Sequence, residues 1–242
     1  MTQNPTLGGH VALVTGASRG IGRALVPALL DAGASKVYAT ARDTAKVADL
    51  AGERVVPLAL DVTDLSSIAA AARRAEDVTL LLNNAGSLRS YDVLGASRAD
   101  LEADLAVNFF GPLEVTKAFR AALAAAEQGV LVNVLTLVSL ASMAGIGGYA
   151  ASKAAALSLT QSLRATLRAE GTRVVGVYPG AVDTDMIRGF EMAKATPESV
   201  AAALVQGVAA GAVDIFPDAM SEPLGALWQK DPKALEARFA SM

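Results

Sequence analysis

The sequence alternates short apolar runs with longer stretches that are rich in alanine and have a helical period. The apolar runs predict strands at residues 10–15, 36–40, 55–60, 79–83, 130–136, 173–178 and 214–216. The stretches between them predict helices at residues 20–32, 44–50, 65–75, 98–109, 112–126, 148–169 and 197–210. Strand–helix–strand alternation produces right-handed crossovers, and therefore a parallel sheet with helices on both faces. We expect an α/β, doubly wound, seven-stranded parallel sheet in the order 3-2-1-4-5-6-7.

Local signals support these helix boundaries. Asp64, Ser97 and Thr196 precede predicted helices and have side chains that cap a helix N-terminus. Pro27 lies inside the first predicted helix, where it removes a hydrogen bond, so we expect a bend there.

Length and charge restrict the class of protein. No linker or charge run divides residues 1–242, which predicts a single domain. The net charge of −3 argues against a nucleic-acid partner. The chain has no cysteine and no cluster of histidine and carboxylate at metal spacing, so neither a disulfide framework nor a metal site is expected. Residues 1–10 lack the pattern of a signal peptide, which favours a cytoplasmic protein.

One long uncharged segment, residues 130–148, resembles a membrane span by length. It contains polar side chains, among them Asn133 and Ser142, and several glycines. A buried parallel strand followed by a loop explains this composition better, and no membrane partner is expected.

A glycine-rich loop follows the first predicted strand. Glycines at this strand–helix turn allow a tight turn and close backbone approach to a pyrophosphate, which the helix N-terminus attracts. This arrangement predicts a dinucleotide-binding Rossmann fold. The candidate contacts are Gly16, Ser18, Arg19, Gly20, Ile21 and Gly22.

The end of the second strand indicates which dinucleotide is bound. NAD-binding folds place an acidic residue there, but this chain has Ala41 followed by Arg42. Asp43 comes one residue too late and is expected to begin the next helix. Arg42, together with Arg19, suits a 2′-phosphate, so NADP(H) is favoured over NAD(H).

Tyr149 and Lys153 are four residues apart on a predicted helix, so they share one face. A lysine beside a tyrosine favours the phenolate and is expected to lower the pKa of the phenol. Tyr149 is therefore a candidate acid and base near neutral pH.

These motifs resemble the short-chain dehydrogenase/reductase family along nearly the whole chain. Besides the glycine loop and the Tyr149–Lys153 pair, further motifs occur in the family's order. They are Asp61-Val62, Asn83-Asn84-Ala85-Gly86, Asn108, and Pro179-Gly180 followed by Val182 and Thr184.

The resemblance implies a role for each motif. Tyr149 would protonate the nascent alkoxide, Lys153 would hold the nicotinamide ribose, and Asn108 would hold a water behind Lys153. The other positions would contact the cofactor: Asp61 and Val62 at the adenine, Asn84, Ala85 and Gly86 at the adenosine and ribose, and Pro179, Gly180, Val182 and Thr184 at the carboxamide and phosphates.

One position departs from the family pattern. The family has a serine thirteen residues before the tyrosine, and here that residue is Thr136. A threonine hydroxyl has the same hydrogen-bonding capacity, so Thr136 is the first candidate to contact the substrate oxygen. Ser139 is the alternative.

The predicted activity is interconversion of a carbonyl and an alcohol with NADP(H). Segments 88–94, 140–147 and 186–194 would wall an apolar pocket, and residues 186–196 would form the substrate loop. The family resemblance implies a homodimer or homotetramer, and Trp228 is expected in a subunit contact or a lid. The alternatives are an NAD-dependent alcohol dehydrogenase and a catalytically silent regulator that senses NADP(H).

Overall fold

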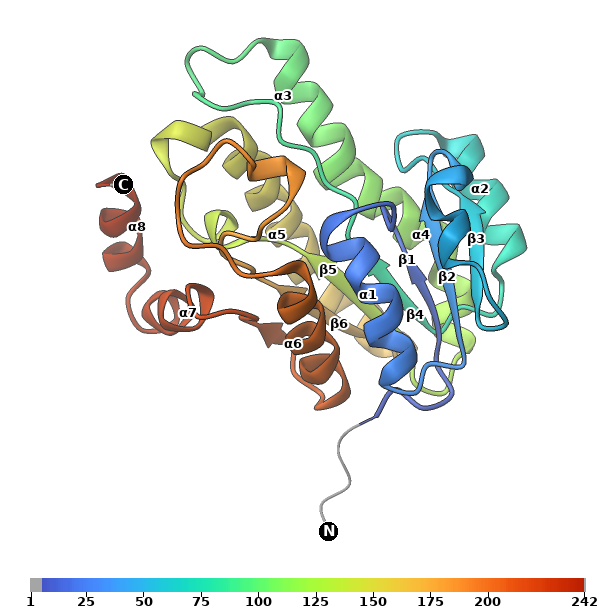
Figure 1. Ribbon diagram of the computed structural model, residues 1–242. Coiled ribbons are helices and arrows are strands. Elements are labelled where there is room, and N and C mark those ends of the chain that lie inside the picture. Colours follow the sequence, from blue (N-terminus) through green and yellow to red (C-terminus); the bar gives the residue numbers. More distant parts are fainter. Residues whose placement is uncertain (1–5, 242) are drawn as a thin grey trace.

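The computed structural model describes residues 6–241, which form one seven-stranded parallel sheet in the order β3-β2-β1-β4-β5-β6-β7 (Figure 1). The strands are β1 (Val11–Val14), β2 (Lys36–Ala41), β3 (Val55–Ala59), β4 (Leu80–Asn83), β5 (Val130–Val134), β6 (Arg173–Val177) and β7 (Asp214–Ile215). The predicted fold class and strand order are confirmed. The order reverses between β1 and β4, the switch point where such sheets bind their ligands.

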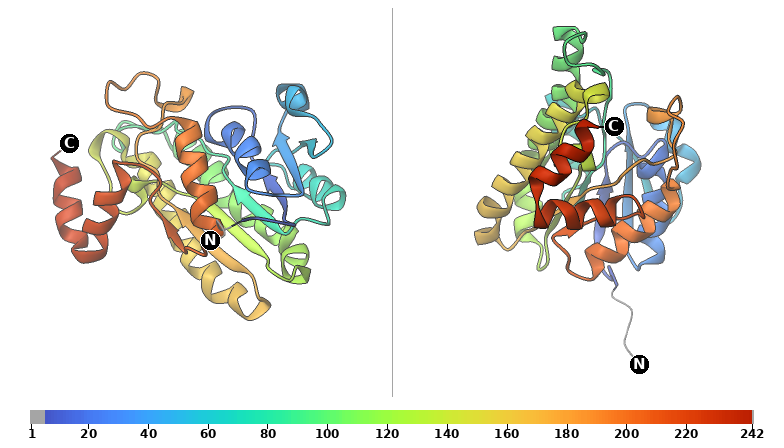
Figure 2. Two further views of the ribbon diagram at one scale, coloured as in Figure 1. Left: turned by 60° about the horizontal axis from the view of Figure 1, so that its bottom comes forward. Right: turned by 90° about the vertical axis from the view of Figure 1, so that its left-hand side faces the viewer.

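Helices cover both faces of the sheet, and the right-hand view of Figure 2 shows the strands between α5 on one side and α1 and α6 on the other. The helices are α1 (Gly20–Asp31), α2 (Leu65–Arg74), α3 (Arg98–Leu105), α4 (Gly111–Ala125), α5 (Gly147–Leu167), α6 (Pro197–Ala209), α7 (Ser221–Lys230) and α8 (Pro232–Ala240). Successive side chains of a strand point to opposite faces. Accordingly, Val14 packs in the core under α1 and α6, while Leu13 packs in the core under α2 and α4.

Most helix boundaries agree with the sequence to within a few residues. Asp64, Ser97 and Thr196 accept hydrogen bonds from the first turns of α2, α3 and α6, as predicted. Residues Thr44–Leu50 form a 3₁₀ helix (η1) instead of an α-helix, and Asp43 caps it. Helix α1 runs unbroken to Asp31 with Pro27 inside it.

Two segments differ from the prediction. The helix predicted at residues 98–109 is α3 followed by a π-helical turn, η2 (Ala106–Phe110), which leads directly into α4. The strand predicted at residues 130–136 ends at Val134, and a 3₁₀ turn, η3 (Leu137–Ser139), follows it.

The last two helices were not predicted. Helices α7 and α8 lie beside the loop that joins β6 to α6 (Figure 1). Trp228 on α7 packs against Tyr178 of the same chain, with ring centroids 6.4 Å apart. Trp228 therefore packs within its own chain, and the expected subunit contact or lid stays a prediction.

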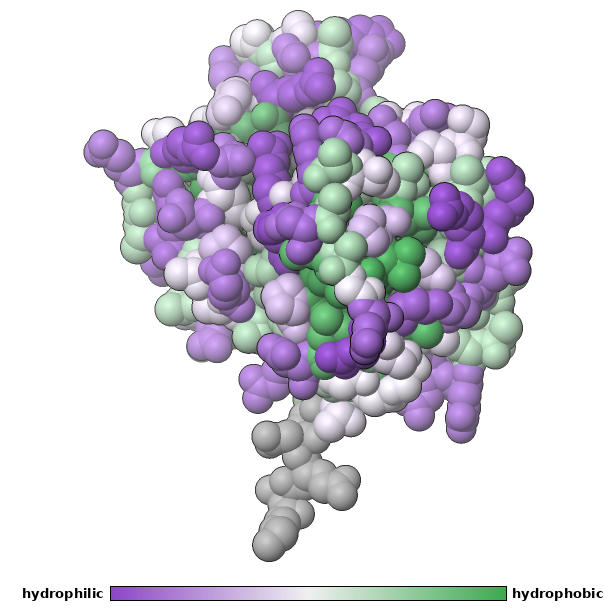
Figure 3. Space-filling view, turned by 45° about the vertical axis from the view of Figure 1, so that its right-hand side comes forward, coloured by the Kyte–Doolittle hydropathy of each residue, from purple (hydrophilic) through white to green (hydrophobic). Residues whose placement is uncertain are grey.

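The surface is mostly polar. Figure 3 brings forward the side on which β2 and β3 lie, and hydrophobic side chains gather there in the middle of a hydrophilic face. Within residues 6–241, no helix is long and apolar enough to cross a membrane.

Candidate active site

The glycine loop lies against the loop that follows β4. Gly16 has φ +69°, and a Cβ atom on it would lie 3.0 Å from Cα of Ala85. A Cβ atom on Gly22 would lie 2.3 Å from the Gly16 carbonyl oxygen and 2.4 Å from Nδ2 of Asn84. Only glycine fits these two positions, because L-residues avoid the positive φ of Gly16 and real Cβ contacts are longer than those at Gly22.

Hydrogen bonds tie the two loops together. Thr15 Oγ1 accepts from the backbone N–H groups of Asn84 at 2.9 Å and Ala85 at 3.0 Å. The Asn84 side chain donates to the Thr15 carbonyl at 2.9 Å. Asn84 therefore shapes the glycine loop, a role that the family resemblance did not specify.

The start of α1 has the properties of a phosphate site. Arg19 precedes the helix in an extended conformation, no side chain caps the first turn, and the first turn carries no acidic residue. Free N–H groups at a helix N-terminus attract anions. These residues fit the pyrophosphate of a dinucleotide.

Two arginines flank this site. Arg42 is exposed just after the end of β2. The Arg19 guanidinium lies 3.1 Å from a carboxylate oxygen of Asp185, and both side chains are largely exposed. Such an exposed pair is weak, so it leaves Arg19 able to bind a phosphate.

Tyr149 and Lys153 lie in the first two turns of α5, and both are buried. Nζ of Lys153 donates to the Val134 carbonyl, at the end of β5, at 2.9 Å. Gly86 marks the point on which the site converges, because a Cβ atom there would lie 3.7 Å from Nζ of Lys153 and 3.5 Å from Oδ1 of Asn108. The sequence motifs on α5, η2 and the β4 loop therefore come together in space.

Asn108 is held by its own network in the π-helical turn. Its Nδ2 donates to the Ser87 carbonyl at 2.8 Å and to Oγ of Ser152 at 2.9 Å, and its Oδ1 accepts from the Ser87 N–H at 3.0 Å. A π turn inside a helix often occurs at a functional site. Here it aims the Asn108 amide at Gly86.

The pKa of Tyr149 differs from the sequence-based expectation. Burial is the largest cause that raises the pKa of Tyr149, and the Asp104 carboxylate adds to it. Burial also lowers the pKa of Lys153 to about 8, although Asp104 acts in the opposite direction. The expected lowering of the Tyr149 pKa by Lys153 does not occur in this structure, because desolvation dominates and the ammonium bonds to Val134.

Thr136 directly precedes η3, and Ser139 is the last residue of η3. Thr136 is partly exposed, in extended backbone directly before η3. Ser139 is buried, and its hydroxyl donates to the Thr136 carbonyl at 2.5 Å. The Ser139 hydroxyl proton is thus already used within the turn, which favours Thr136 as the substrate contact.

The other predicted cofactor positions surround the carboxyl ends of the strands. Asp61 follows β3, and its carboxylate accepts from the Thr63 N–H at 2.9 Å. Val62 packs against the start of α4, since a Cβ on Gly111 would lie 3.0 Å from its Cγ2. These contacts fix the turn after β3 beside the predicted adenine pocket.

The loop after β6 reaches back to the glycine loop. The Pro179 carbonyl accepts from the Leu137 N–H at 3.1 Å, and the Gly180 N–H donates to Asp218 at 2.9 Å. Val182 forms a bridge with Ala195 that brings together the two ends of the predicted substrate loop. A Cβ on Gly20 would lie 3.0 Å from Cγ2 of Thr184, so Thr184 lies at the glycine loop.

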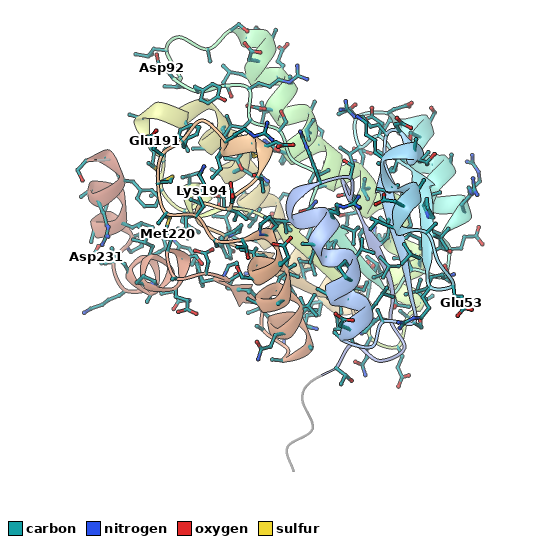
Figure 4. All side chains as sticks on the ribbon, viewed as in Figure 1. Glu53, Asp92, Glu191, Lys194, Met220 and Asp231 are labelled. Carbon is teal, nitrogen blue, oxygen red and sulfur yellow. The ribbon has the colours of Figure 1, made fainter. Side chains whose placement is uncertain are left out.

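Aromatic side chains from two of the predicted wall segments stack on each other. The Tyr91 and Phe190 rings stack with centroids 6.3 Å apart. In Figure 4, Asp92 and Glu191 label these two segments, while Glu53 lies at the far side of the molecule. Lys194 donates to the Ile187 carbonyl at 2.9 Å, within the substrate loop. The predicted walls at residues 88–94 and 186–194 therefore do approach each other.

Sequence reasoning missed Asp104 and Thr15. Asp104 is completely buried and precedes Asn108 by four residues. Its signal was the i, i+4 spacing, which places both side chains on one helix face.

In the described part of the chain, no group of three or more histidines or carboxylates is placed to hold a metal ion.

Comparisons with known proteins agree with this geometry. The family model described as short chain dehydrogenase matches residues 10–195. The 3-oxoacyl-(acyl-carrier-protein) reductase FabG of Vibrio harveyi is 34% identical over 191 residues, 76% of this chain and 78% of that protein. The short-chain dehydrogenase PC-15 of Penicillium crustosum is 37% identical over 182 residues, 72% of this chain and 66% of that protein.

Solved structures also match over most of their length. A short chain dehydrogenase from Burkholderia cenocepacia, crystallised with NADP, is 39% identical with a TM-score of 0.90, covering 97% of this chain and 98% of that one. A gluconate 5-dehydrogenase from the same species, in complex with NADP and tartrate, is 26% identical with a TM-score of 0.82, covering 89% and 96%. The chain therefore belongs to the short-chain dehydrogenase/reductase family.

Proposed function

We propose that this protein is an NADP(H)-dependent oxidoreductase that interconverts a carbonyl and an alcohol, with Tyr149 as its acid and base. The observation that carries the proposal is the convergence of Lys153 and Asn108 on Gly86, one turn from Tyr149, at the carboxyl ends of the central strands. When bound, the nicotinamide supplies or accepts the hydride.

The residues of the chain then supply position and protons. Tyr149 keeps its phenolic proton at neutral pH because burial raises its pKa, so it is ready to protonate an alkoxide during reduction. Lys153 has a pKa of about 8 and carries a positive charge at pH 7 that stabilises the developing oxyanion. Thr136 donates the second hydrogen bond to that oxygen.

NADP(H) is the proposed cofactor. Arg42, after β2, and Arg19, in the glycine loop, provide two guanidinium groups where a 2′-phosphate would lie. The NADP complexes of the two Burkholderia cenocepacia proteins support this choice.

The proposed substrate is an uncharged ketone, aldehyde or secondary alcohol. Tyr91, Val93 and Phe190 are apolar and at least partly exposed in the predicted wall segments. Lys194 donates to a backbone carbonyl instead of facing an anion. The apolar side chains of these segments therefore favour a neutral substrate.

We also propose that the chain assembles as a homodimer or homotetramer and works in the cytoplasm. Phe110, at the junction of η2 and α4, is an exposed aromatic side chain with 53% of its surface accessible. Exposed aromatic side chains are enriched at subunit interfaces. Sedimentation measurements test the assembly.

The test of function measures loss of NADPH absorbance with a panel of neutral ketones and aldehydes, with NADH in parallel. Tyr149→Phe should bind NADPH as the wild type does and lose turnover by about 100-fold or more. Arg42→Ala should raise the KM for NADPH by about 10-fold and leave the KM for NADH unchanged.

Each alternative gives a different result. A preference for NADH would support an NAD-dependent alcohol dehydrogenase. NADPH binding without reduction of any carbonyl would support a regulator that senses the cofactor. Undiminished turnover in Tyr149→Phe would refute the mechanism.

A further inference from the structure

Asp104 is a completely buried carboxylate without a cationic partner. Its relative exposure is 0%, and it lies near the end of α3, one turn before Asn108. Within residues 6–241, no lysine, arginine or histidine forms an ion pair with it. Buried carboxylates are rare unless they are paired, so this one needs a reason to be there.

Neutral donors surround this carboxylate. Its Oδ1 accepts from the Ser87 hydroxyl at 2.6 Å, and its Oδ2 accepts from the Ser90 hydroxyl at 2.6 Å. The backbone N–H groups of Arg89 and Ser90 each donate to Oδ2 at 3.0 Å. Hydrogen bonds to a charged acceptor are short and strong, and together they hold residues 87–90 in one conformation.

The loop of residues 87–91 forms hydrogen bonds both to the first turn of α5 and to Asn108. The Ser90 carbonyl accepts from the Tyr149 N–H at 3.0 Å, and the Tyr91 carbonyl accepts from the Gly148 N–H at 3.3 Å. At its other end, Ser87 exchanges two hydrogen bonds with the Asn108 side chain. The loop therefore links Asn108 to the first turn of α5.

Packing makes this link rigid. A Cβ atom on Gly148 would lie 2.6 Å from both Cβ and Oγ of Ser90, so the loop lies directly against α5. Ser90 has 1% of its surface exposed. Any movement of the loop must therefore move the start of α5 and the Tyr149 backbone.

The carboxylate also sets the charge around the two reactive side chains. The buried hydrophobic side chains that cluster with Tyr149 come from η3, α5, α7 and α8. Arg89, on the 87–90 loop, is exposed. Asp104 is thus the one anion that acts on both Tyr149 and Lys153 among the described residues.

We propose that Asp104 is a positioning residue of the active site, a buried anion that fixes loop 87–91 between Asn108 and α5 and so determines where the Tyr149 phenol lies. This role rests on the proposed acid and base function of Tyr149. Asp104 does not touch the substrate and acts through the loop and through its charge.

Two substitutions separate the effect of the Asp104 charge from the effect of its hydrogen bonds to the loop. Asp104→Asn removes the charge but keeps the frame, because its Oδ1 still accepts from the two N–H groups and its Nδ2 donates to the Ser87 hydroxyl. Asp104→Ala removes both the charge and the hydrogen bonds. Glu102→Gln is the matched control, since Glu102 lies on the same helix with an exposed side chain.

The first readout is the pH dependence of carbonyl reduction. Removing a nearby anion makes the Lys153 ammonium easier to deprotonate and the Tyr149 phenol easier to ionise, so the alkaline loss of kcat in Asp104→Asn should move to lower pH by about half a pH unit or more. Glu102→Gln should keep the wild-type profile, because its charge is exposed to solvent. A wild-type profile in Asp104→Asn would overturn the electrostatic part of the proposal.

The second readout is amide hydrogen exchange, which does not depend on activity. In Asp104→Ala, exchange at residues 89, 90 and 149 should accelerate by about 10-fold or more, while β-strand amides stay protected. The same variant should lose kcat by about 10-fold and change the KM for cofactor little. Unchanged exchange at these amides would overturn the positioning role, even if the wild type reduced no carbonyl and the proposed function itself failed.

Discussion

Replacing Lys153 with methionine should stabilise the protein while it removes activity. Burial lowers the pKa of Lys153 from 10.5 to about 8. At about 1.4 kcal/mol for each pH unit, keeping this ammonium charged in the folded protein costs about 3 kcal/mol at pH 7. Lys153→Met removes that cost but leaves the Val134 carbonyl without its donor, a loss of about 1 kcal/mol. The net expectation at pH 7 is a gain of about 2 kcal/mol.

The gain should depend on pH in a definite direction. Below pH 8 the lysine is charged in both the folded and the unfolded chain, so the wild type bears the full burial cost. As the pH rises from 8 towards 10.5, the folded protein releases the proton and the unfolded chain keeps it, so the cost shrinks. The advantage of Lys153→Met should therefore fall by about 2 kcal/mol between pH 7 and about pH 9.5.

Urea denaturation at a series of pH values, followed by circular dichroism at one protein concentration, measures this difference. Lys46→Met removes an exposed lysine and is the control, with an expected change within about 0.5 kcal/mol at every pH. A Lys153→Met protein that is less stable than wild type at pH 7 would refute the reasoning. So would an advantage that stays constant as the pH rises.

Two further pairs of variants test the cofactor loop and the substrate contact. Gly22→Ala should lose about 1–3 kcal/mol of stability and bind NADPH more weakly, because its Cβ would lie 2.3 Å from the Gly16 carbonyl oxygen. Gly52→Ala is the control, since a Cβ there has no neighbour within 4 Å, and it should change neither property. Urea titration measures the stability, and fluorescence titration measures NADPH binding. Thr136→Ala should lower kcat by about 100-fold, as loss of one donor to the oxyanion does, while Ser139→Ala should lower kcat by less than about 10-fold. The opposite order in steady-state kinetics would assign the substrate contact to Ser139.

The order of strands and helices along the chain allowed the fold to be predicted from the sequence. Parallel strands buried on both faces need continuous apolar runs, and each run in this chain is separated from the next by a stretch of helical period. Helices α7 and α8 were not predicted, because they follow the last strand–helix–strand unit. They pack through Trp228 of α7 and Leu235 of α8, and no local sequence pattern predicts these contacts.

The sequence also predicted the candidate site, since its motifs lie at fixed places on the fold. Gly16, Gly22 and the Tyr149–Lys153 pair carry local geometric signals, namely a turn that excludes a side chain and a helical spacing of four. The structure places these residues in the turn and on the helix that the local spacing predicts, and their roles in binding and catalysis stay predictions.

Tertiary structure decided the chemistry of the same residues. Spacing suggested that Lys153 lowers the pKa of Tyr149, whereas burial of the phenol and the Asp104 charge raise it. Solvation depends on every element packed around a group, and those neighbours come from α3, β5, α7 and α8, far apart in the sequence. The sequence determined which groups meet at the carboxyl ends of the strands, while only the folded environment fixed their charge and orientation, because desolvation and long-range hydrogen bonds have no local signature.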